Sequence, residues 1–86
     1  MINFENMNYY LIKGKVIKDG IVSTDGFYLI ETDFNNIDIY SVNIGYTKIK
    51  NAESIIIDSS TYSMNELKNY CQHLIKLETL YLNLPR

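Results

Sequence analysis

The sequence predicts an α+β domain, in which an antiparallel meander sheet of four to six strands is followed by one C-terminal amphipathic helix. Residues 8–58 contain runs that alternate apolar and polar side chains, and Asp-Gly and Asx-rich segments separate these runs as turns separate strands. From about residue 64 the apolar side chains recur every three or four positions, which is typical of a helix. Because 86 residues leave no room for a second core, we expect a single domain over 1–86.

The first half of the chain carries the strand signals. Tyr9–Lys18 alternates clearly, and the pair Asp19-Gly20 that follows favours a type I′ hairpin. A second pair, Asp25-Gly26, comes six residues later, so we expect a tight meander, with one larger bend from residue 19 to residue 26 as the alternative. Further strands are expected at 27–32, 37–44 and 54–58, with a β-bulge near Tyr40-Ser41 and a weak strand or loop over 46–50.

The second half predicts one helix over about residues 64–82. Ser63 and Glu66 have the spacing of a capping box, in which each side chain accepts a hydrogen bond from the other residue's backbone N–H. The apolar stripe continues nearly to the end of the chain, but Glu78 falls within it and the last turn is apolar almost all round. A short strand over 80–84 is the alternative for this last segment.

Composition and charge exclude several classes of function. Eight Lys and Arg against ten Asp and Glu give a net charge of −2, and the single Arg is the last residue, so nucleic-acid binding is not expected. No apolar run approaches the ~20 residues of a membrane span, and the first eight residues lack a signal-peptide pattern. One Cys fits a reducing compartment. We therefore expect a cytoplasmic protein that does not enter a membrane.

Catalytic, metal and cofactor sites are not expected either. Cys71 and His73 are two positions apart, so a helix directs them about 160° away from each other and they cannot act together or chelate one ion. Cys71 is expected to be a small buried hydrophobe and His73 a surface residue. A Ser-His-Asp arrangement would have to use His73, and no glycine-rich phosphate motif precedes the helix. The chain is therefore expected to be a protein without enzymatic activity.

Tyr and Lys residues of the strands are the candidates for recognition. Tyr is enriched in interfaces because its ring is apolar and its hydroxyl polar. Lys13 and Lys15 share one face of the first strand with Tyr9, and we place these side chains on the surface. The partner-binding residues that we predict are Tyr9, Lys13, Lys15, Tyr28, Tyr40 and Tyr46, and we expect these four tyrosines at the surface.

One helix can cover only one face of the predicted sheet, and this indicates a partner. Positions that we place on the other face are still rather apolar; these are Tyr9, Leu11, Ile17, Tyr28 and Ile30. An uncovered apolar face and an apolar helix end together favour a homodimer or a complex with another protein. The oligomer interface that we predict consists of Glu78, Leu80, Tyr81, Leu82 and Leu84.

Protein binding is therefore the function that the sequence favours, in a non-enzymatic interaction module. The abundance of Ile, Asn, Tyr and Lys is typical of an AT-rich genome, and with the small size it favours an inhibitor or regulator of a host enzyme, encoded by a phage or a mobile element. The expected partner is a host protein or a second copy of the chain. The alternative is an oligomer that binds a small, nucleotide-like ligand in a pocket between subunits.

Overall fold

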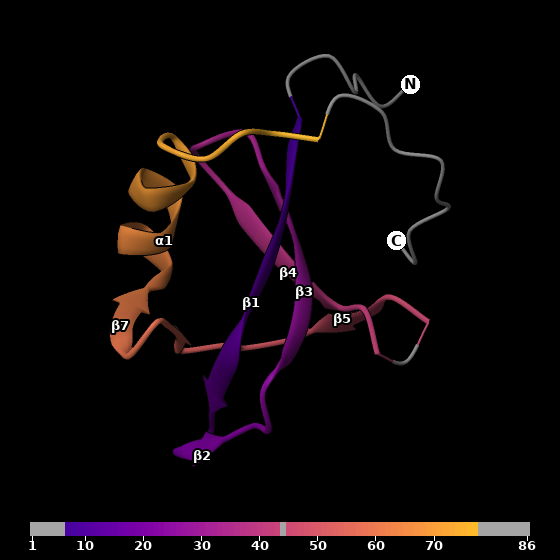
Figure 1. Cartoon of the computed structure of the whole chain (residues 1–86), viewed down its shortest axis with the longest axis vertical. Coiled ribbons are helices and arrows are strands. Elements are labelled where there is room, and N and C mark those ends of the chain that lie inside the picture. The colour runs from indigo at the N-terminus through magenta and orange to yellow at the C-terminus, as the bar shows by residue number, and fades with distance from the viewer. Residues whose placement is uncertain (1–6, 44, 78–86) are drawn as a thin grey trace.

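The computed structural model describes residues 7–43 and 45–77, and over these residues it contains seven strands and one helix (Figure 1). The elements are β1 (Asn8–Lys18), β2 (Ile21–Val22), β3 (Gly26–Thr32), β4 (Ile37–Ser41), β5 (Thr47–Ile49), β6 (Ser54–Ile57), β7 (Ser60–Ser63) and α1 (Met64–Cys71). All strand pairs are antiparallel. The predicted α+β fold, a sheet followed by one helix, is confirmed.

The sheet is organised around β1. The strand order is β5-β4-β3-β1-β6-β7, and β2 pairs only with the end of β1. Residues 8–14 of β1 pair with β3, whereas residues 15–17 pair with β6. β1 therefore belongs to two parts of the sheet, one with β3, β4 and β5 and the other with β6 and β7.

Gly14 lies where β1 passes from one part of the sheet to the other. A Cβ atom at this position would collide with the backbone carbonyl of Ile56 on β6, so the close approach of these two strands requires glycine. Gly26 lies opposite Gly14 on β3, and a Cβ atom there would meet only the side chain of Asn43. β3 begins at Gly26, so the pair Asp25-Gly26 leads into a strand and does not form a two-residue turn.

Two-residue hairpin turns occur at two places in the described chain, and only one of them was predicted. Asp19 and Gly20 join β1 to β2 with positive φ angles of 53° and 73°. Because β2 is short and β3 pairs with β1 itself, the predicted tight meander is wrong and the larger bend from 19 to 26 is observed. Asp58 and Ser59 join β6 to β7 with φ angles of 48° and 70°. Neither is glycine, so this turn gave no signal in the sequence.

The predicted bulge in β4 is absent. β4 pairs with β3 in one continuous register, from Ser41 opposite Tyr28 to Ile37 opposite Thr32. The apolar side chains of β4 do not keep to one face of the strand, because both faces are buried. Ile39 belongs to one apolar cluster and Tyr40 to another, and each is 1% exposed.

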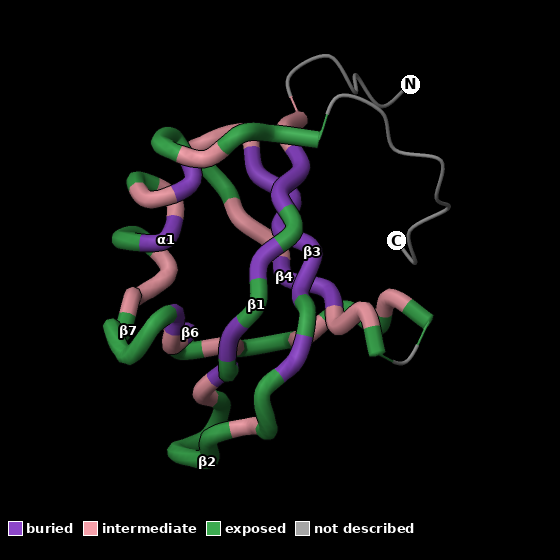
Figure 2. The backbone as a smooth tube through the Cα atoms, in the orientation of Figure 1, coloured by how far each residue is buried: buried purple, intermediate pink, exposed green. Residues whose placement is uncertain are grey.

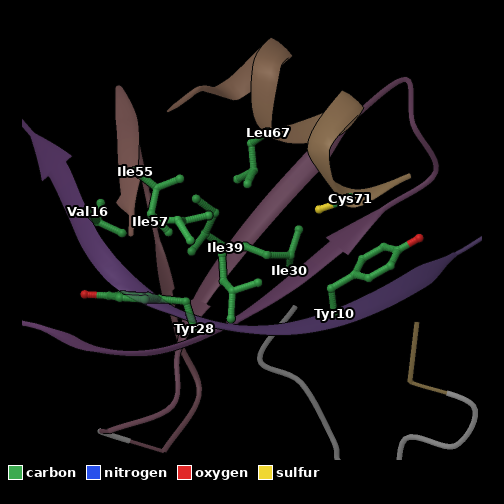
Figure 3. Close-up of a cluster of buried hydrophobic side chains, with 10 residues drawn as sticks. Tyr10, Val16, Tyr28, Ile30, Ile39, Ile55, Ile57, Leu67 and Cys71 are labelled. Atoms are coloured by element: carbon green, nitrogen blue, oxygen red, sulfur yellow. The ribbon is translucent and has the colours of Figure 1, made fainter. Parts of the chain in front are cut away.

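The main core lies between the sheet and α1 (Figures 2 and 3). It consists of Tyr10, Ile12, Val16, Tyr28, Ile30, Ile39, Ile55, Ile57, Leu67 and Cys71. Leu67 and Cys71 come from α1 and are fully buried. Burial of such side chains contributes about 1.5–3 kcal/mol each, so the apolar side of the helix fixes it to the sheet.

α1 begins as predicted but ends earlier. Ser63 Oγ accepts a 3.2 Å hydrogen bond from the Glu66 N–H, and Glu66 Oε1 accepts one of 3.0 Å from the Ser63 N–H, which confirms the capping box. The helix ends at Cys71, whereas the sequence predicted about residue 82. No Gly or Pro marks this end, so the apolar spacing alone suggested that the helix continued.

After α1 the chain turns through residues 72–74 and reaches β1. There the Leu77 N–H donates a 2.7 Å hydrogen bond to the Tyr9 carbonyl. In the part of the chain that the structure describes, no helix is long and apolar enough to cross a membrane. The predicted oligomer-interface residues, and with them the alternative strand over 80–84, lie outside the described residues; these are Glu78, Leu80, Tyr81, Leu82 and Leu84.

Candidate interaction surface

The sheet face that points away from α1, here called the outer face, brings together three of the six predicted recognition residues. In an antiparallel pair, residues directly opposite each other point to the same face. Tyr9 lies opposite Glu31, and Lys13 opposite Phe27. The outer face consists of Tyr9, Leu11, Lys13, Phe27, Leu29, Glu31, Asp38, Tyr40 and Lys48.

The centre of the outer face is a second small core, formed by Tyr9, Leu29 and Tyr40. Glu31 lies beside it and is only 2% exposed. The Tyr9 hydroxyl donates a 2.7 Å hydrogen bond to Glu31 Oε2, and the Tyr40 hydroxyl lies 3.5 Å from Oε1. A buried carboxylate requires such donors. We expected Tyr9 and Tyr40 on the surface, and this was wrong because their hydroxyls bind Glu31 inside the protein.

Tyr28 lies apart from the other predicted residues, on the inner face. It is opposite Ile12 and 5% exposed, and its hydroxyl lies 2.9 Å from Ser23 Oγ. We expected it to be exposed beside Tyr9, and this was also wrong. Its neighbours Phe27 and Leu29 lie on the outer face instead, because side chains alternate along a strand.

The predicted Lys residues are accessible, and Tyr46 is half-buried against the outer core. Lys13 and Lys15 are exposed on the same side of β1. Lys13 Nζ lies 3.5 Å from Asp25 Oδ2, and both side chains keep roughly half or more of their surface in solvent. Such an exposed pair is weak, so both charges remain available to a partner.

Leu11 and Phe27 form an exposed apolar pair, of which only Leu11 was predicted to lie on the outward face. Leu11 is 51% exposed and Phe27 48% exposed. Because Leu11 lies opposite Leu29 and Phe27 opposite Lys13, the two are diagonal neighbours on β1 and β3. Leu11, Lys13 and Phe27 are here called the outer patch. Phe27 could have been found once Tyr28 was assigned to the inner face.

A hollow between the β1–β2 hairpin and β5 is a second feature that could bind a molecule. Its volume is about 460 Å³, within the range of small-ligand sites. The wall is mostly apolar, and Lys18 and the hydrogen-bonded hydroxyls of Ser23 and Tyr28 add polar groups. The residues that line it are Val16, Lys18, Asp19, Ile21, Ser23, Tyr28, Thr47, Lys48 and Ile49.

Cys71 and His73 lie as the sequence predicted, the first buried and the second exposed. Burial raises the pKa of the Cys71 thiol to about 11, which makes the thiol a poor nucleophile at neutral pH. Over residues 7–43 and 45–77, no three His, Cys, Asp or Glu side chains lie close enough together to hold a metal ion. Comparisons with protein-family models, curated proteins and solved structures found no match.

Proposed function

We propose that this protein is a non-enzymatic protein–protein interaction module that binds its partner through the outer patch. The observation that carries the proposal is the adjacent exposure of Leu11 and Phe27 on the sheet face that α1 does not cover. Each Å² of apolar surface removed from water contributes about 25 cal/mol. Aromatic side chains are frequent anchors at the centre of interfaces.

The charges around the outer patch indicate the chemistry of the partner. Lys13 and Lys15 flank the apolar pair on β1, and the acidic side chain of Asp25 compensates only Lys13. A complementary surface has an apolar pocket bordered by acidic side chains. A host enzyme with such a surface is the partner that we propose. A small inhibitor or regulator encoded by a phage or mobile element fits the size and the AT-rich composition of the chain.

Capture of partners from a host lysate on immobilised protein tests this function. Phe27→Glu places a charge in the centre of the patch. Val22→Glu is the matched control, because Val22 on β2 is 49% exposed and lies outside the patch. We expect wild type and Val22→Glu to retain the same partner and Phe27→Glu to lose it, with similar thermal midpoints for all three. Equal capture by Phe27→Glu contradicts the proposal.

Small-ligand binding is the second candidate, and the hollow of about 460 Å³ favours it. Lys18 and Lys48 at its wall would attract an anionic group, and the apolar wall would accept a base or ring. Thermal unfolding with ATP, GTP and UTP tests this candidate. Stabilisation that Lys18→Ala abolishes would support the hollow as a ligand site. An unchanged midpoint with all three nucleotides would leave the interaction module as the better explanation.

A further inference from the structure

We propose that β1 accepts one extended segment of the partner as an additional strand, in the gap between β1 and the end of α1. This inference rests on the proposed function, because it specifies how a protein partner binds. The outer patch and the gap are continuous, since Leu11 belongs to both. Three features support the proposal: an edge of β1 that no described strand occupies beside Leu11 and Lys13, the shape of the gap and the residues that line it.

The hydrogen bonds of β1 show which of its backbone groups lie on the edge that faces away from β3. The Tyr9 carbonyl accepts from the Leu77 N–H at 2.7 Å, and the Ile17 carbonyl accepts from the Glu53 N–H at 2.8 Å. Neither donor belongs to β3, so the odd-numbered residues of β1 direct their backbone groups away from β3. Backbone groups alternate along a strand, so Leu11 and Lys13 present their N–H and C=O groups on this same edge.

Among the described strands, β6 alone occupies this edge of β1, and it pairs only with residues 15–17. No described strand therefore pairs with Leu11 and Lys13 on this side. Sheet edges are usually protected by several charged side chains, by proline or by a bulge. Here the edge carries the exposed Leu11 and a single Lys, so it can accept an added strand.

The gap beside this edge has a volume of about 290 Å³ and walls on two sides. One wall is β1, and the other is the end of β6 with the end of α1 and the chain that follows it. Its lining is Tyr10, Leu11, Ile12, Lys13, Ile57, Asp58, Tyr70, Leu74 and Ile75. With walls on both sides, the gap admits a single extended segment more readily than the edge of a second copy's sheet, whose neighbouring strands would approach β6 and α1.

The lining indicates the sequence of the added strand. Tyr70 and Leu74 are half-buried and Ile75 is 96% exposed, so apolar side chains of the added strand would cover them. Successive side chains of a strand point to opposite faces, so the partner segment has an apolar residue at every second position. The intervening residues lie on the outer face beside Lys13, where acidic side chains are favoured.

Selection from a phage-displayed library of random ten-residue peptides tests the proposal. We expect enriched peptides with alternating apolar residues. Their affinity, measured by fluorescence anisotropy, should fall at least about tenfold for Lys13→Pro, which lacks the edge N–H. Lys13→Ala is the matched control, because it keeps the N–H and loses the same side chain and Asp25 contact. Its affinity should change less than about threefold. Equal affinity for Lys13→Pro and Lys13→Ala, or enrichment without alternation, overturns the proposal.

A second measurement does not depend on the folding of the proline variant. Peptides methylated at single backbone nitrogens are titrated against wild-type protein. Methylation at alternate positions should weaken binding about tenfold or more, whereas intervening positions should tolerate it. A uniform or absent effect overturns strand addition. A lysate partner that is lost with Phe27→Glu but retained by Lys13→Pro keeps the proposed function and refutes only this mode of binding.

Discussion

The Tyr9 hydroxyl donates a 2.7 Å hydrogen bond to the carboxylate of Glu31, the residue directly opposite it on β3. The Tyr40 hydroxyl approaches the same carboxylate from β4 at 3.5 Å. One buried acidic group thus connects three strands on the outer face. Hydrogen bonds from the two hydroxyl groups offset part of the cost of burying this polar side chain.

Tyr9→Phe removes the shorter of these hydrogen bonds, and we expect it to lower the free energy of unfolding by about 1–3 kcal/mol. Urea denaturation measures the change. Tyr46→Phe is the control, because Tyr46 packs against the same cluster and its hydroxyl makes no hydrogen bond to another described residue. Equal losses in the two variants would show that the contact with Glu31 contributes little.

Gly14→Ala should destabilise the protein by about 1–3 kcal/mol or more, because the new methyl group meets the rigid Ile56 carbonyl. Gly26→Ala is the comparison. There the methyl group meets the Asn43 amide, and an exposed side chain can rotate away. We therefore expect a clearly smaller loss for Gly26→Ala in thermal or urea unfolding. A similar loss for both would contradict the role given to the β1–β6 contact.

Ser59→Gly should stabilise the protein by about 0.5–1 kcal/mol. Ser59 has a φ of 70° in the β6–β7 turn, a conformation that glycine adopts without a steric penalty. Ser60→Gly, one residue further and within β7, should destabilise instead, because glycine weakens a strand. Thermal midpoints of the two variants should move in opposite directions. A lower midpoint for Ser59→Gly would show that the turn has another conformation.

Acid should weaken the start of α1. The backbone N–H and the hydroxyl of Ser63 lower the pKa of the Glu66 carboxyl below its ordinary value of 4.5. A lowered folded-state pKa means that the stabilisation is present above pH 4.5 and is lost as the pH falls through the folded value. Glu66→Gln should therefore show a shallower acid loss in urea titrations at several pH values, and should differ little from wild type in strong acid. Parallel pH profiles would argue against this contribution.

Cys71 should resist thiol reagents while the protein is folded. Burial raises the pKa of its thiol to about 11, from an ordinary 9.0. The thiolate fraction at pH 8 is then about a hundredfold lower than in the unfolded chain, and reagents lack access as well. Labelling with Ellman's reagent should be at least that much slower than in urea. Rapid labelling of the folded protein would place Cys71 outside the core.

Local chemistry was predictable from the sequence. The capping box depends on two residues of one turn, Ser63 and Glu66, and the Asp19-Gly20 turn likewise depends on adjacent residues. The inner face of β1 followed from its alternation. The end of α1 at Cys71 was not predictable, because no Gly or Pro marks it and the apolar spacing continues beyond it.

The candidate surface was predicted in part. Exposure of Lys13 and Lys15 followed from their charge, since an ammonium group is costly to bury. The orientations of Tyr9 and Tyr28 could not be predicted, because a strand buried on both faces has two apolar sides. The cross-strand register decides which of the two faces a tyrosine occupies. Burial of Tyr9 also depends on the carboxylate opposite it.

β1 pairs with strands in both parts of the sheet, and this affects how the chain folds during translation. Within this domain β1 is synthesised before the other strands, yet its partner β6 comes about forty residues later in the chain, with Ile56 opposite Lys15. Contacts between distant segments slow folding, since a long loop must close before they form. The nascent chain can thus form only the β1–β2–β3–β4 part early, and residues 15–17 of β1 wait for β6 until most of the domain has been synthesised.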